Sequence, residues 1–444
     1  MLNKRNILKF VNILTVIFIL NAVIFKQAYA ILQANLFTTP NNITVILLPD
    51  SNTDLISVNM AFKGAGSKTD PVGKEGLSYT ALQMLYRSPS DGMDRNKRSR
   101  TVKELGVIDG INVDMSQDNL LIQFKCPEEN LFKIMNIVAG ILINHQLKDD
   151  ELNKLKNFTN DIQLETTSEV GFAKHALESK IFINHPYGLP PNGLANSIQT
   201  LGLNDIKNTI KNNLAKNNLI VSIVGNIDQK KSIQYIDQSF AKLPAKANLK
   251  PVSSIIPKLD GSLQTIIKNS PQTGTVFALK APAFNSKDYY PMLILNRIFG
   301  GTPFTSRLWI EIREKRGLAY EIGSYIFNGE LSDILLGYFK CDNKNSAQLI
   351  DLVKTELKKL QTNGVTEQEL INAKSGLIGE SALRFITTEQ TSERLLTSHL
   401  LGGTIQDINE FNQKINAVTI LEVNNVATKY FNVNELTTVS VGNQ

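Results

Sequence analysis

The sequences LIVSIVGN at residues 219–226 and LTTVSVGN at residues 436–443 decide the fold of this chain. The second begins 217 residues after the first, and each follows a polar stretch with helical character, at 204–216 and at 420–431. A strand that ends on the same Val-Gly-Asn tripeptide after the same kind of helix indicates an internal duplication. The chain is therefore expected to contain one structural unit twice.

Two further matches support the duplication. The tripeptide Phe-Lys-Cys at 124–126 recurs at 339–341, 215 residues later, which is almost the same offset. Each half also opens with a strand, a polar loop and a second, more apolar strand. These pairs lie at 43–48 with 55–63 and at 264–268 with 273–279. Chance is a poor explanation for three matches in the same order at nearly one offset.

Strand-like and helix-like segments mix within each half. Residues 119–126 are rich in apolar and aromatic side chains and predict a strand, whereas 128–145 repeat apolar side chains with the helical period. Thr366 and Glu369 form a capping box that begins a helix running toward Gly379. These patterns predict an α+β fold of two repeated α+β domains, each with a mostly antiparallel sheet and helices.

The composition is that of an ordinary globular protein. Hydrophobic residues make up 42% and charged residues 20% of the 444 positions, which excludes a disordered chain, a collagen or a coiled coil. Residues 242–261 hold three prolines among scattered Lys and Ser, and this predicts a linker at 243–261. We therefore expect an N-terminal domain at 31–242 and a C-terminal domain at 262–444.

Residues 1–30 have the organisation of an export signal. A basic start precedes an almost wholly apolar run at 11–25, and Ala-Tyr-Ala at 28–30 matches a small-residue cleavage site. The pattern predicts a Sec-type signal peptide cleaved after Ala30, and hence a periplasmic or secreted protein. An uncleaved anchor helix is the alternative, and only then is contact with a membrane expected.

The net charge argues against a nucleic-acid partner. The formal charge is +6, but the signal segment holds four basic residues and no acid, which leaves +2 for the mature chain. Such a charge does not supply the basic field that binding of nucleic acid requires. One local basic cluster is expected to be a solvated loop and helix start. Its members are Arg95, Lys97, Arg98, Arg100 and Lys103.

The two cysteines, Cys126 and Cys341, occupy equivalent positions in the two copies. Equivalent positions of two repeated domains meet only where both lie on the axis that relates the domains. We therefore expect two separate, buried and free thiols rather than a disulfide.

A glycine-rich loop and the segment after it form the most specific motif. Residues 299–308 read FGGTPFTSRL and residues 312–320 read IREKRGLAY, so that six residues separate Arg313 from Tyr320. These residues resemble the C-terminal domain of the insulinase/pitrilysin family of zinc peptidases. The resemblance is closest to its mitochondrial-processing-peptidase-like and bacterial periplasmic members.

Two segments of the first half fit the same resemblance. The sequence GKEGL at 73–77 stands where the family has its G-x-x-G-x-A-H opening, and HPYG at 185–188 matches the family's H-P-Y-G segment. The resemblance covers nearly all of the mature chain. It implies two repeated α+β domains that close on each other like a clam shell.

The zinc motif of that family is missing. Members that cleave peptides carry H-x-x-E-H on a helix, in which two histidines bind zinc and the glutamate is the general base. Here Tyr79 and Gln83 stand in place of the histidines, and Leu82 replaces the glutamate. The family's third ligand, a glutamate, aligns with Asp161, and a lone carboxylate does not hold zinc. We expect no metal in this chain; the resemblance implies a non-catalytic member whose partner subunit holds the zinc.

The four histidines do not replace the motif, because they lack ligand spacing with one another. They are His145, His175, His185 and His399. His175 and Glu178 share a helix face and provide two groups at most. His185 is expected to fix its own turn, and His399 is expected on a helix face.

Arg313, Tyr320, Gly300 and Gly301 are the candidate substrate-binding residues. The resemblance implies that the Arg/Tyr pair binds the peptide backbone and stabilises the tetrahedral intermediate at the zinc of the other half. In some members two chains divide the work: one carries the zinc motif, and the other keeps the glycine-rich loop or the Arg/Tyr pair. The alternative is that Arg313 is one charge of a solvated helix and that Tyr320 fills the core.

These observations favour a non-catalytic subunit of an exported, heterodimeric zinc metallopeptidase, with a homologous H-x-x-E-H subunit as partner and a peptide as substrate. The peptide is expected to bind in extended form along a sheet edge. The alternative is a peptide-binding or structural subunit of a larger assembly with no proteolytic role. Phe304 and Trp309 are expected to pack beside the glycine-rich loop, with contact to peptide as the alternative for Phe304.

Overall fold

The computed structural model describes residues 32–165 and 168–443, except for the side chains of residues 158–165. The predicted signal segment, 1–30, lies outside the described residues. Among the helices that the structure describes, none is long and apolar enough to cross a membrane.

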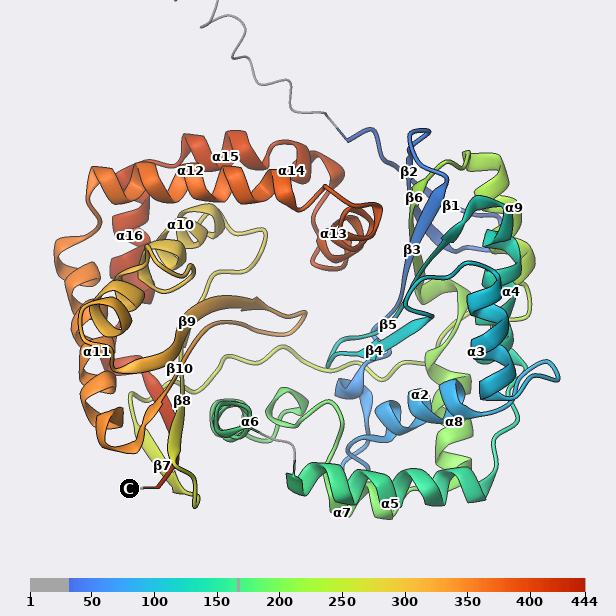
Figure 1. The fold of residues 1–444 in the computed structure, drawn as a ribbon, viewed down its shortest axis with the longest axis horizontal. Helices are drawn as coiled ribbons and strands as arrows, with labels where there is room; N and C mark the ends of the chain where they lie inside the picture. The colour runs from blue at the N-terminus through green and yellow to red at the C-terminus, as the bar shows by residue number, and fades with distance from the viewer. Residues whose placement is uncertain (1–31, 166–167, 444) are drawn as a thin grey trace, which may run out of the picture. The chain divides into compact units, whose positions relative to one another are not determined.

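The first half builds a six-stranded sheet in the order β1-β2-β6-β3-β5-β4 (Figure 1). Its strands are β1 (Asn35–Thr38), β2 (Thr44–Pro49), β3 (Leu55–Lys63), β4 (Asn112–Met115), β5 (Asn119–Pro127) and β6 (Leu219–Gly225). Strands β2 and β6 run parallel, and each of the other neighbouring pairs is antiparallel. The predicted mostly antiparallel sheet is therefore confirmed.

The second half builds a five-stranded sheet in the order β7-β11-β8-β10-β9. Its strands are β7 (Leu263–Ile267), β8 (Gln272–Lys280), β9 (Ala319–Asn328), β10 (Asp333–Asp342) and β11 (Thr437–Gly442). This order repeats β2-β6-β3-β5-β4 of the first sheet, including the single parallel pair, here β7 with β11. The predicted duplication of an α+β unit is therefore confirmed, with β1 as an addition to the first copy.

Helices connect and cover the strands in both halves (Figure 1). Those of the first half are α2 (Leu77–Arg87), α3 (Arg95–Glu104), α4 (Leu131–Ile143), α5 (Asp149–Glu165), α6 (Glu169–Ile181), α7 (Ala195–Gln199), α8 (Leu203–Asn213) and α9 (Gln229–Ser239). Those of the second half are α10 (Tyr289–Phe299), α11 (Ser346–Asn363), α12 (Glu367–Leu383), α13 (Thr388–Leu400), α14 (Ile405–Asn409), α15 (Phe411–Ala417) and α16 (Ile420–Tyr430). The capping box predicted at Thr366 and Glu369 is present at the start of α12.

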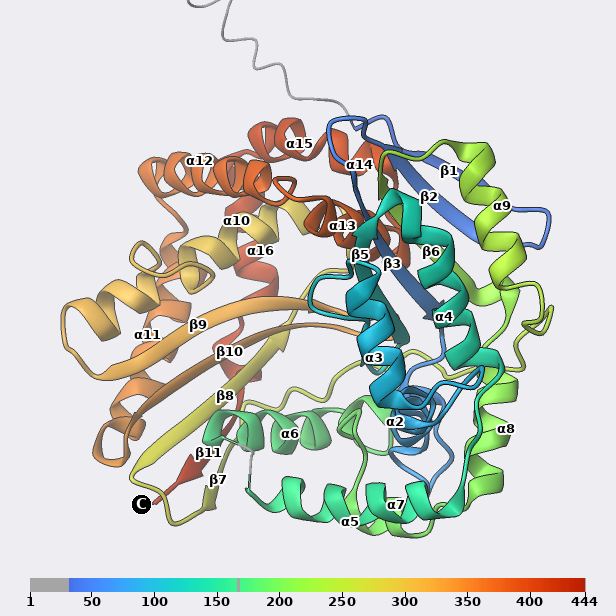
Figure 2. The ribbon, with the colours of Figure 1, turned by 45° about the vertical axis from the view of Figure 1, so that its right-hand side comes forward.

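The two halves exchange one helix each. Helix α6 of the first half packs against β8 and β11 of the second sheet, and helix α13 of the second half packs against β3 and β6 of the first sheet (Figure 2). Apolar side chains drive both contacts. Ala173 and Leu177 of α6 belong to one apolar cluster with Val276 of the second sheet. Leu395 of α13 belongs to another, together with apolar side chains of the first sheet. Each sheet is therefore covered on one face by a helix of the other half.

Two ion pairs accompany the exchange, and they occupy equivalent positions. Lys125 Nζ lies 2.7 Å from a carboxylate oxygen of Glu389, and Lys340 Nζ lies 3.2 Å from one of Glu169. Both lysines are the middle residue of the repeated Phe-Lys-Cys tripeptide, and both glutamates lie in the first turn of an exchanged helix. Partial burial alone would raise the pKa of each glutamate, but hydrogen bonds and the lysine charge outweigh it and keep the pKa below its ordinary value.

Residues 243–261, where the sequence predicts a linker, contain no helix or strand. The segment is fixed by backbone hydrogen bonds to both halves. The Lys258 N–H donates to the Ile181 carbonyl at 2.8 Å, and the Ile255 N–H donates to the Leu331 carbonyl at 3.0 Å. The connection is therefore packed against the halves that it joins.

The two thiols are expected to react independently once the protein is unfolded. Cys126 lies in β5 and Cys341 in β10, in different sheets, and both are buried and free, as the sequence predicts. Burial raises the pKa of each thiol to about 12, so neither is a reactive thiolate in the folded chain. Alkylation in denaturant without reductant should add two labels by mass, whereas alkylation of the native protein should add few. A denatured mass without labels would mean a disulfide and would contradict the fold.

Candidate functional site

Helix α2 carries the residues that replace the zinc motif. Leu82 is 3% exposed and belongs to the first core, and Tyr79 is half-buried against the same core. Gln83 is also half-buried. Leucine has no donor atom for a metal, and a neutral phenol and an amide are poor ligands for zinc. These side chains do not fit a zinc ion, and a leucine cannot move a proton.

The remaining candidates do not supply a metal site either. Asp161 lies in α5, but its side chain is outside the described residues. His175 Nδ1 lies 3.5 Å from a carboxylate oxygen of Glu178, which gives two groups. Among the described residues, no group of three or more His, Cys, Asp or Glu side chains could hold a metal ion. The described side chains of this chain therefore offer no set of ligands for a catalytic metal ion.

The other histidines either bond to the backbone or are partly enclosed by the fold. His185 begins the short helix η3 (Pro186–Gly188): its Nδ1 accepts from the Tyr187 N–H at 3.2 Å, and its Nε2 lies 3.0 Å from the Ser253 carbonyl. The predicted role of His185 in fixing its turn is confirmed. His145 and His399 are partly enclosed, and burial lowers the pKa of both. His399 lies on α13, as expected of a helix-face residue.

The start of α2 retains the geometry of the glycine segment GKEGL. Gly76 caps the helix with φ of +93°, and a Cβ there would lie 2.8 Å from the Gly193 Cα, so only glycine fits. Asp70 accepts hydrogen bonds from the Gly76 N–H and the Ser78 N–H, both at 2.9 Å. A carboxylate at this position satisfies free N–H groups of the first turn and favours the helix dipole. These contacts therefore hold helix α2 in place although it does not carry H-x-x-E-H.

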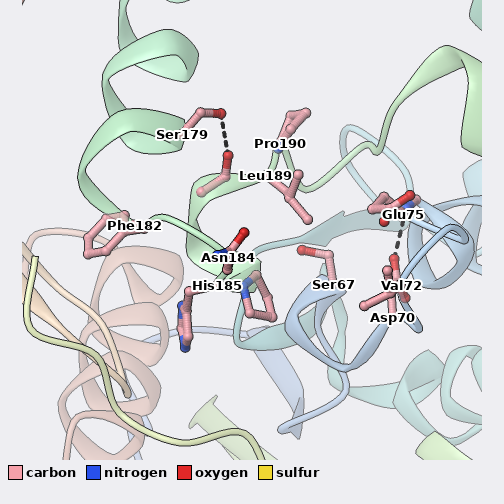
Figure 3. Close-up of a pocket in the computed structure, with 13 residues that line it drawn as sticks. Ser67, Asp70, Val72, Glu75, Ser179, Phe182, Asn184, His185, Leu189 and Pro190 are labelled. Atoms are coloured by element: carbon pink, nitrogen blue, oxygen red, sulfur yellow. Dashed lines mark hydrogen bonds between the residues drawn. The ribbon is translucent and has the colours of Figure 1, made fainter.

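A pocket of about 360 Å³ lies between the GKEGL segment and the HPYG segment (Figure 3). It is lined by Ser67, Asp70, Val72, Glu75, Gly76, Ser179, Phe182, Asn184, His185, Pro186, Gly188, Leu189 and Pro190. Figure 3 shows Asp70 and Val72 on one wall and Asn184 and His185 on the other, with Ser67 between them. Burial raises the pKa of Asp70 to about 6, although hydrogen bonds oppose the shift. Two segments far apart in the sequence thus form one pocket whose charge changes with pH.

Tyr187, the third residue of HPYG, joins the two halves. Its hydroxyl donates to Asp118, 2.8 Å from both carboxylate oxygens, and accepts from the Leu331 N–H at 3.1 Å. The Glu330 N–H donates to Asp118 at 3.1 Å, and the buried Lys68 ammonium lies 3.0 Å from Asp118 and 2.6 Å from Glu330. Lys68, Asp118 and Tyr187 are buried, whereas the Glu330 side chain is 42% exposed. We name these four residues the buried latch after the three buried members. Burial and the charge of Asp118 raise the pKa of Tyr187, which keeps the phenol protonated.

The buried latch connects equivalent turns of the two copies. Asp118 lies in the turn between β4 and β5, and Glu330 lies in the turn between β9 and β10. Sequence reasoning missed this cluster, because Lys68 and Asp118 are isolated charges with no motif around them. The available signal was the duplication itself, which makes these two turns counterparts of each other.

Arg313 and Tyr320 both lie at the surface. Arg313 belongs to the π-helix η5 (Trp309–Glu314), and its guanidinium lies 4.2 Å from the centre of the Trp309 ring. Tyr320 is the second residue of β9 and is 53% exposed, so the alternative in which it fills the core is wrong. Its hydroxyl donates to Asp342 at 2.9 Å, and this hydrogen bond raises the pKa of Tyr320.

Gly300 and Gly301 bring the glycine-rich loop against β9. The Ser324 N–H of β9 donates to the Gly300 carbonyl at 2.9 Å. A Cβ at Gly300 would lie 2.7 Å from the Ser324 hydroxyl, and one at Gly301 would lie 2.9 Å from the Asn296 carbonyl. The glycines are therefore required by close approach of the backbone, whatever they contact outside the chain.

Strands β4 and β9 are the last strands of their sheets at equivalent ends. A terminal strand has one side free to pair with an extended segment of another chain. Tyr320 is the second residue of β9, and η5 packs against the same strand. The candidate residues of the second half therefore lie around β9, and the glycine-rich loop is already bonded to the unpaired side of this strand at Ser324.

Two sequence expectations need correction. The basic cluster at 95–103 is not wholly solvated, because Arg98 is buried and donates to the Ser88 carbonyl at 3.0 Å and to the Ser90 hydroxyl at 3.2 Å. It is a structural residue that ties α3 to the end of α2. Phe304 packs only against Trp309, with ring centroids 4.9 Å apart, and is otherwise 71% exposed, whereas Trp309 is partly buried against the second core as expected.

Sequence models of one peptidase family match both halves of the chain. The model described as Insulinase (Peptidase family M16) matches residues 44–192, and the model described as Peptidase M16 inactive domain matches residues 200–377. Together the two matches extend over most of the residues in the two repeated units.

Curated relatives match over nearly their whole length. The chain is 23% identical over 398 residues to "Uncharacterized zinc protease YmxG" of Bacillus subtilis, covering 89% of this chain and 95% of the relative. In Helicobacter pylori, it is 25% identical over 405 residues to "Non-peptidase homolog YmxG", covering 87% and 89%. It is also 25% identical over 415 residues to "Zinc protease PqqE" of that organism, covering 90% and 91%.

Solved structures share the fold. A peptidase M16 inactive domain from Pseudomonas fluorescens superposes with a TM-score of 0.86 at 21% identity, covering 93% of this chain and 98% of that one. A protease from Helicobacter pylori superposes with a TM-score of 0.82 at 21% identity, covering 93% and 100%. The two-domain α+β architecture predicted from the sequence is confirmed by these likenesses.

Removal of the Tyr187 hydroxyl should destabilise the chain. Tyr187→Phe leaves the Leu331 N–H without its acceptor and Asp118 without one donor, both in a buried site. We expect the free energy of unfolding in urea to fall by about 1–3 kcal/mol. Tyr430→Phe is the matched control, because the Tyr430 hydroxyl donates to Asp288, which Lys429 also holds at 2.6 Å. Equal losses in both variants would contradict a special role for the buried latch.

The purified mature chain should hold no stoichiometric zinc. The reason is that Tyr79, Leu82 and Gln83 replace both histidine ligands and the general base. Elemental analysis after dialysis against metal-free buffer measures this, with a relative that carries H-x-x-E-H treated in the same way as the positive control. One tightly held zinc ion per chain would refute the assignment of a degenerate motif.

Proposed function

The chain belongs to the insulinase family, peptidase family M16, and on that basis we propose that it is the non-catalytic subunit of an exported, two-chain zinc metallopeptidase. Its partner would be a homologous chain that carries H-x-x-E-H and holds the zinc. Export rests on the signal pattern of residues 1–30. The substrate would be a peptide in extended form.

The observation that carries this proposal is a contrast within the chain. Where the family needs a general base, Leu82 is packed into the core, whereas Arg313 and Tyr320 are exposed at and before the start of β9. The names of two relatives support the division of work, since Helicobacter pylori has both a "Zinc protease PqqE" and a "Non-peptidase homolog YmxG".

The residues of this chain would act as hydrogen-bond donors. The hydrogen bond to Asp342 raises the pKa of Tyr320 and keeps the phenol neutral, and its single proton would have to leave Asp342 to be donated to a substrate. Arg313 carries a permanent charge and five N–H groups, and its stacking on Trp309 restricts its orientation. Donors held toward a developing oxyanion act mainly in the transition state. The partner would supply the metal and the general base.

A second candidate function is peptide binding without proteolysis. It is favoured by β4, the terminal strand of the first sheet, which could add an extended strand whether or not a zinc subunit is present. In that case Arg313 and Tyr320 would bind peptide and no reaction would follow.

Reconstitution distinguishes the two functions. Mixed with an exported H-x-x-E-H homologue from the same cell, the chain should raise peptidase activity well above that of either chain alone. Arg313→Ala or Tyr320→Phe should lower turnover by about 10²–10³ while the complex still assembles, as measured by size-exclusion chromatography with light scattering.

Control variants are available at neighbouring positions of the same segment. Arg316→Ala removes an exposed arginine that already pairs with Glu311 at 2.8 Å, and Tyr325→Phe removes the hydroxyl of another exposed tyrosine of β9. Both should leave turnover unchanged. Full activity of the Arg313 and Tyr320 variants in an active complex would make the pair structural. Failure of every homologue to associate would favour the second function.

A further inference from the structure

The basic residues of helix α3 divide between two faces. Arg95, Arg98 and Lys103 line a pocket of about 90 Å³ that is enclosed by α3, the end of α2 and α4 (Figure 1). Positions three and eight residues after Arg95 return to the same side of a helix, which explains why these side chains converge. Lys97 and Arg100 are exposed and do not line the pocket. One face of the helix is therefore solvated, and the other forms the wall of a basic pocket.

Arg98 is a buried charge without a carboxylate partner. It is 3% exposed, and its guanidinium donates to the carbonyls of Ser88 and Tyr86 and to the Ser90 hydroxyl, all of which are neutral. Burial lowers the pKa of Arg98, and Asp94, which caps α3, opposes the shift without forming an ion pair. A buried charge is costly unless an opposite charge pairs with it. An anion beside Arg98 would provide that pairing.

The internal hydrogen bonds leave part of the Arg98 guanidinium available. Nη1 donates twice and Nη2 once, so the N–H of Nε and one N–H of Nη2 have no acceptor among the described residues. Nε and Nη2 are also the nitrogens with which Arg307 holds the two carboxylate oxygens of Glu369, at 2.7 and 2.8 Å. Because Arg98 lines the pocket, these nitrogens can hold an oxyanion there in the same way.

Two further cations surround the same space. The guanidinium carbons of Arg95 and Arg98 lie 5.7 and 6.0 Å from the centre of one ring, that of Tyr86, so the two charges are held near each other. Lys103 adds a third positive charge, and no Asp or Glu lines the pocket. In the part of the chain that the structure describes, neither Arg95 nor Lys103 has an ion-pair partner. Like charges gathered without an acid repel each other, and a bound anion would remove that repulsion.

We propose that this pocket is a binding site for the phosphate group of a small phosphate compound. Its volume of about 90 Å³ suits a single tetrahedral oxyanion, whereas drug-sized ligands occupy roughly 300–1,000 Å³. Arginine is the preferred partner of phosphate because its planar fork matches two oxygens at once. The Ser99 hydroxyl, which also lines the pocket, adds a neutral donor. The site uses none of the residues of the proposed function and does not rest on it.

Inorganic phosphate is the probe. Isothermal titration calorimetry of the purified mature chain with sodium phosphate, at an ionic strength held constant with sodium chloride, should show saturable binding with a dissociation constant of about 1 mM or lower. Phosphate should also raise the melting temperature above that in sodium chloride of equal ionic strength, because a ligand that binds only the folded chain stabilises it.

Single substitutions on α3 separate the pocket from the general charge of the helix. Arg95→Ala and Lys103→Ala should each weaken phosphate binding about tenfold. Both side chains are exposed at the pocket wall, so both variants should fold. Arg100→Ala is the matched control, because it removes the same charge from the solvated face of the same helix and should bind phosphate normally.

The phosphate group can come from a soluble compound or from a lipid headgroup, and vesicles distinguish these sources. Flotation with phosphatidylcholine vesicles that contain phosphatidic acid, lost in Arg95→Ala and kept in Arg100→Ala, would support the site and identify a lipid headgroup. Binding of free phosphate without flotation would support the site and identify a soluble phosphate.

Three outcomes would overturn the site. The first is equal stabilisation by phosphate and by chloride at one ionic strength. The second is unchanged phosphate affinity in both Arg95→Ala and Lys103→Ala. The third is an equal loss of affinity in Arg100→Ala, which would mean a general effect of charge on the helix. These measurements use the chain alone without peptide, so their failure leaves the proposed function standing and their success does not support it.

Discussion

The exchange of α6 and α13 is the constraint on which the rest of the structure depends. An apolar sheet face must be covered, and here each half lacks the helix that covers one face of its own sheet. The clusters around Leu177 and Leu395 therefore contain side chains from both halves. Since neither sheet can bury that face alone, residues 34–444 behave as one compact unit although the sequence is a duplication.

This constraint explains why polar groups at the boundary can be buried. Lys68 is only 5% exposed, and a buried ammonium is costly unless it is paired and hydrogen-bonded. The exchanged helices hold the halves together, and the turns that carry Asp118 and Glu330 then meet around Lys68 and Tyr187. The apolar contacts of the exchanged helices hold the two halves together. The buried latch then fixes the β4–β5 hairpin relative to the β9–β10 hairpin. The end of β9 far from Tyr320 is thereby anchored to the first half.

The features that could be predicted from the sequence are those encoded by short local patterns or by the internal repeat. The duplication, the mostly antiparallel sheets, the capping box of α12 and the free thiols all follow from short patterns and their offsets. The exchange, the buried latch and the burial of Arg98 do not, because they depend on which residues meet across long stretches of chain. Nothing in a single sequence distinguishes a buried Lys68 from a solvated lysine. The exposure of Phe304 was misjudged for the same reason, since an aromatic residue in a loop is packed or exposed according to its distant neighbours.

Helix α2 and the glycine-rich loop differ in how well their side chains are packed. At position 82 a glutamate would be a buried charge unless a metal and its ligands compensated it, so leucine removes that desolvation cost once the histidines are absent. Asp70 and Gly76 still hold the helix, and the change therefore leaves a well-packed core. The loop is packed less well: Phe304 has a positive φ, and its side chain is 71% exposed although its ring lies beside that of Trp309. Core packing therefore accounts for Leu82, whereas packing within the described residues does not account for the positive φ of Phe304.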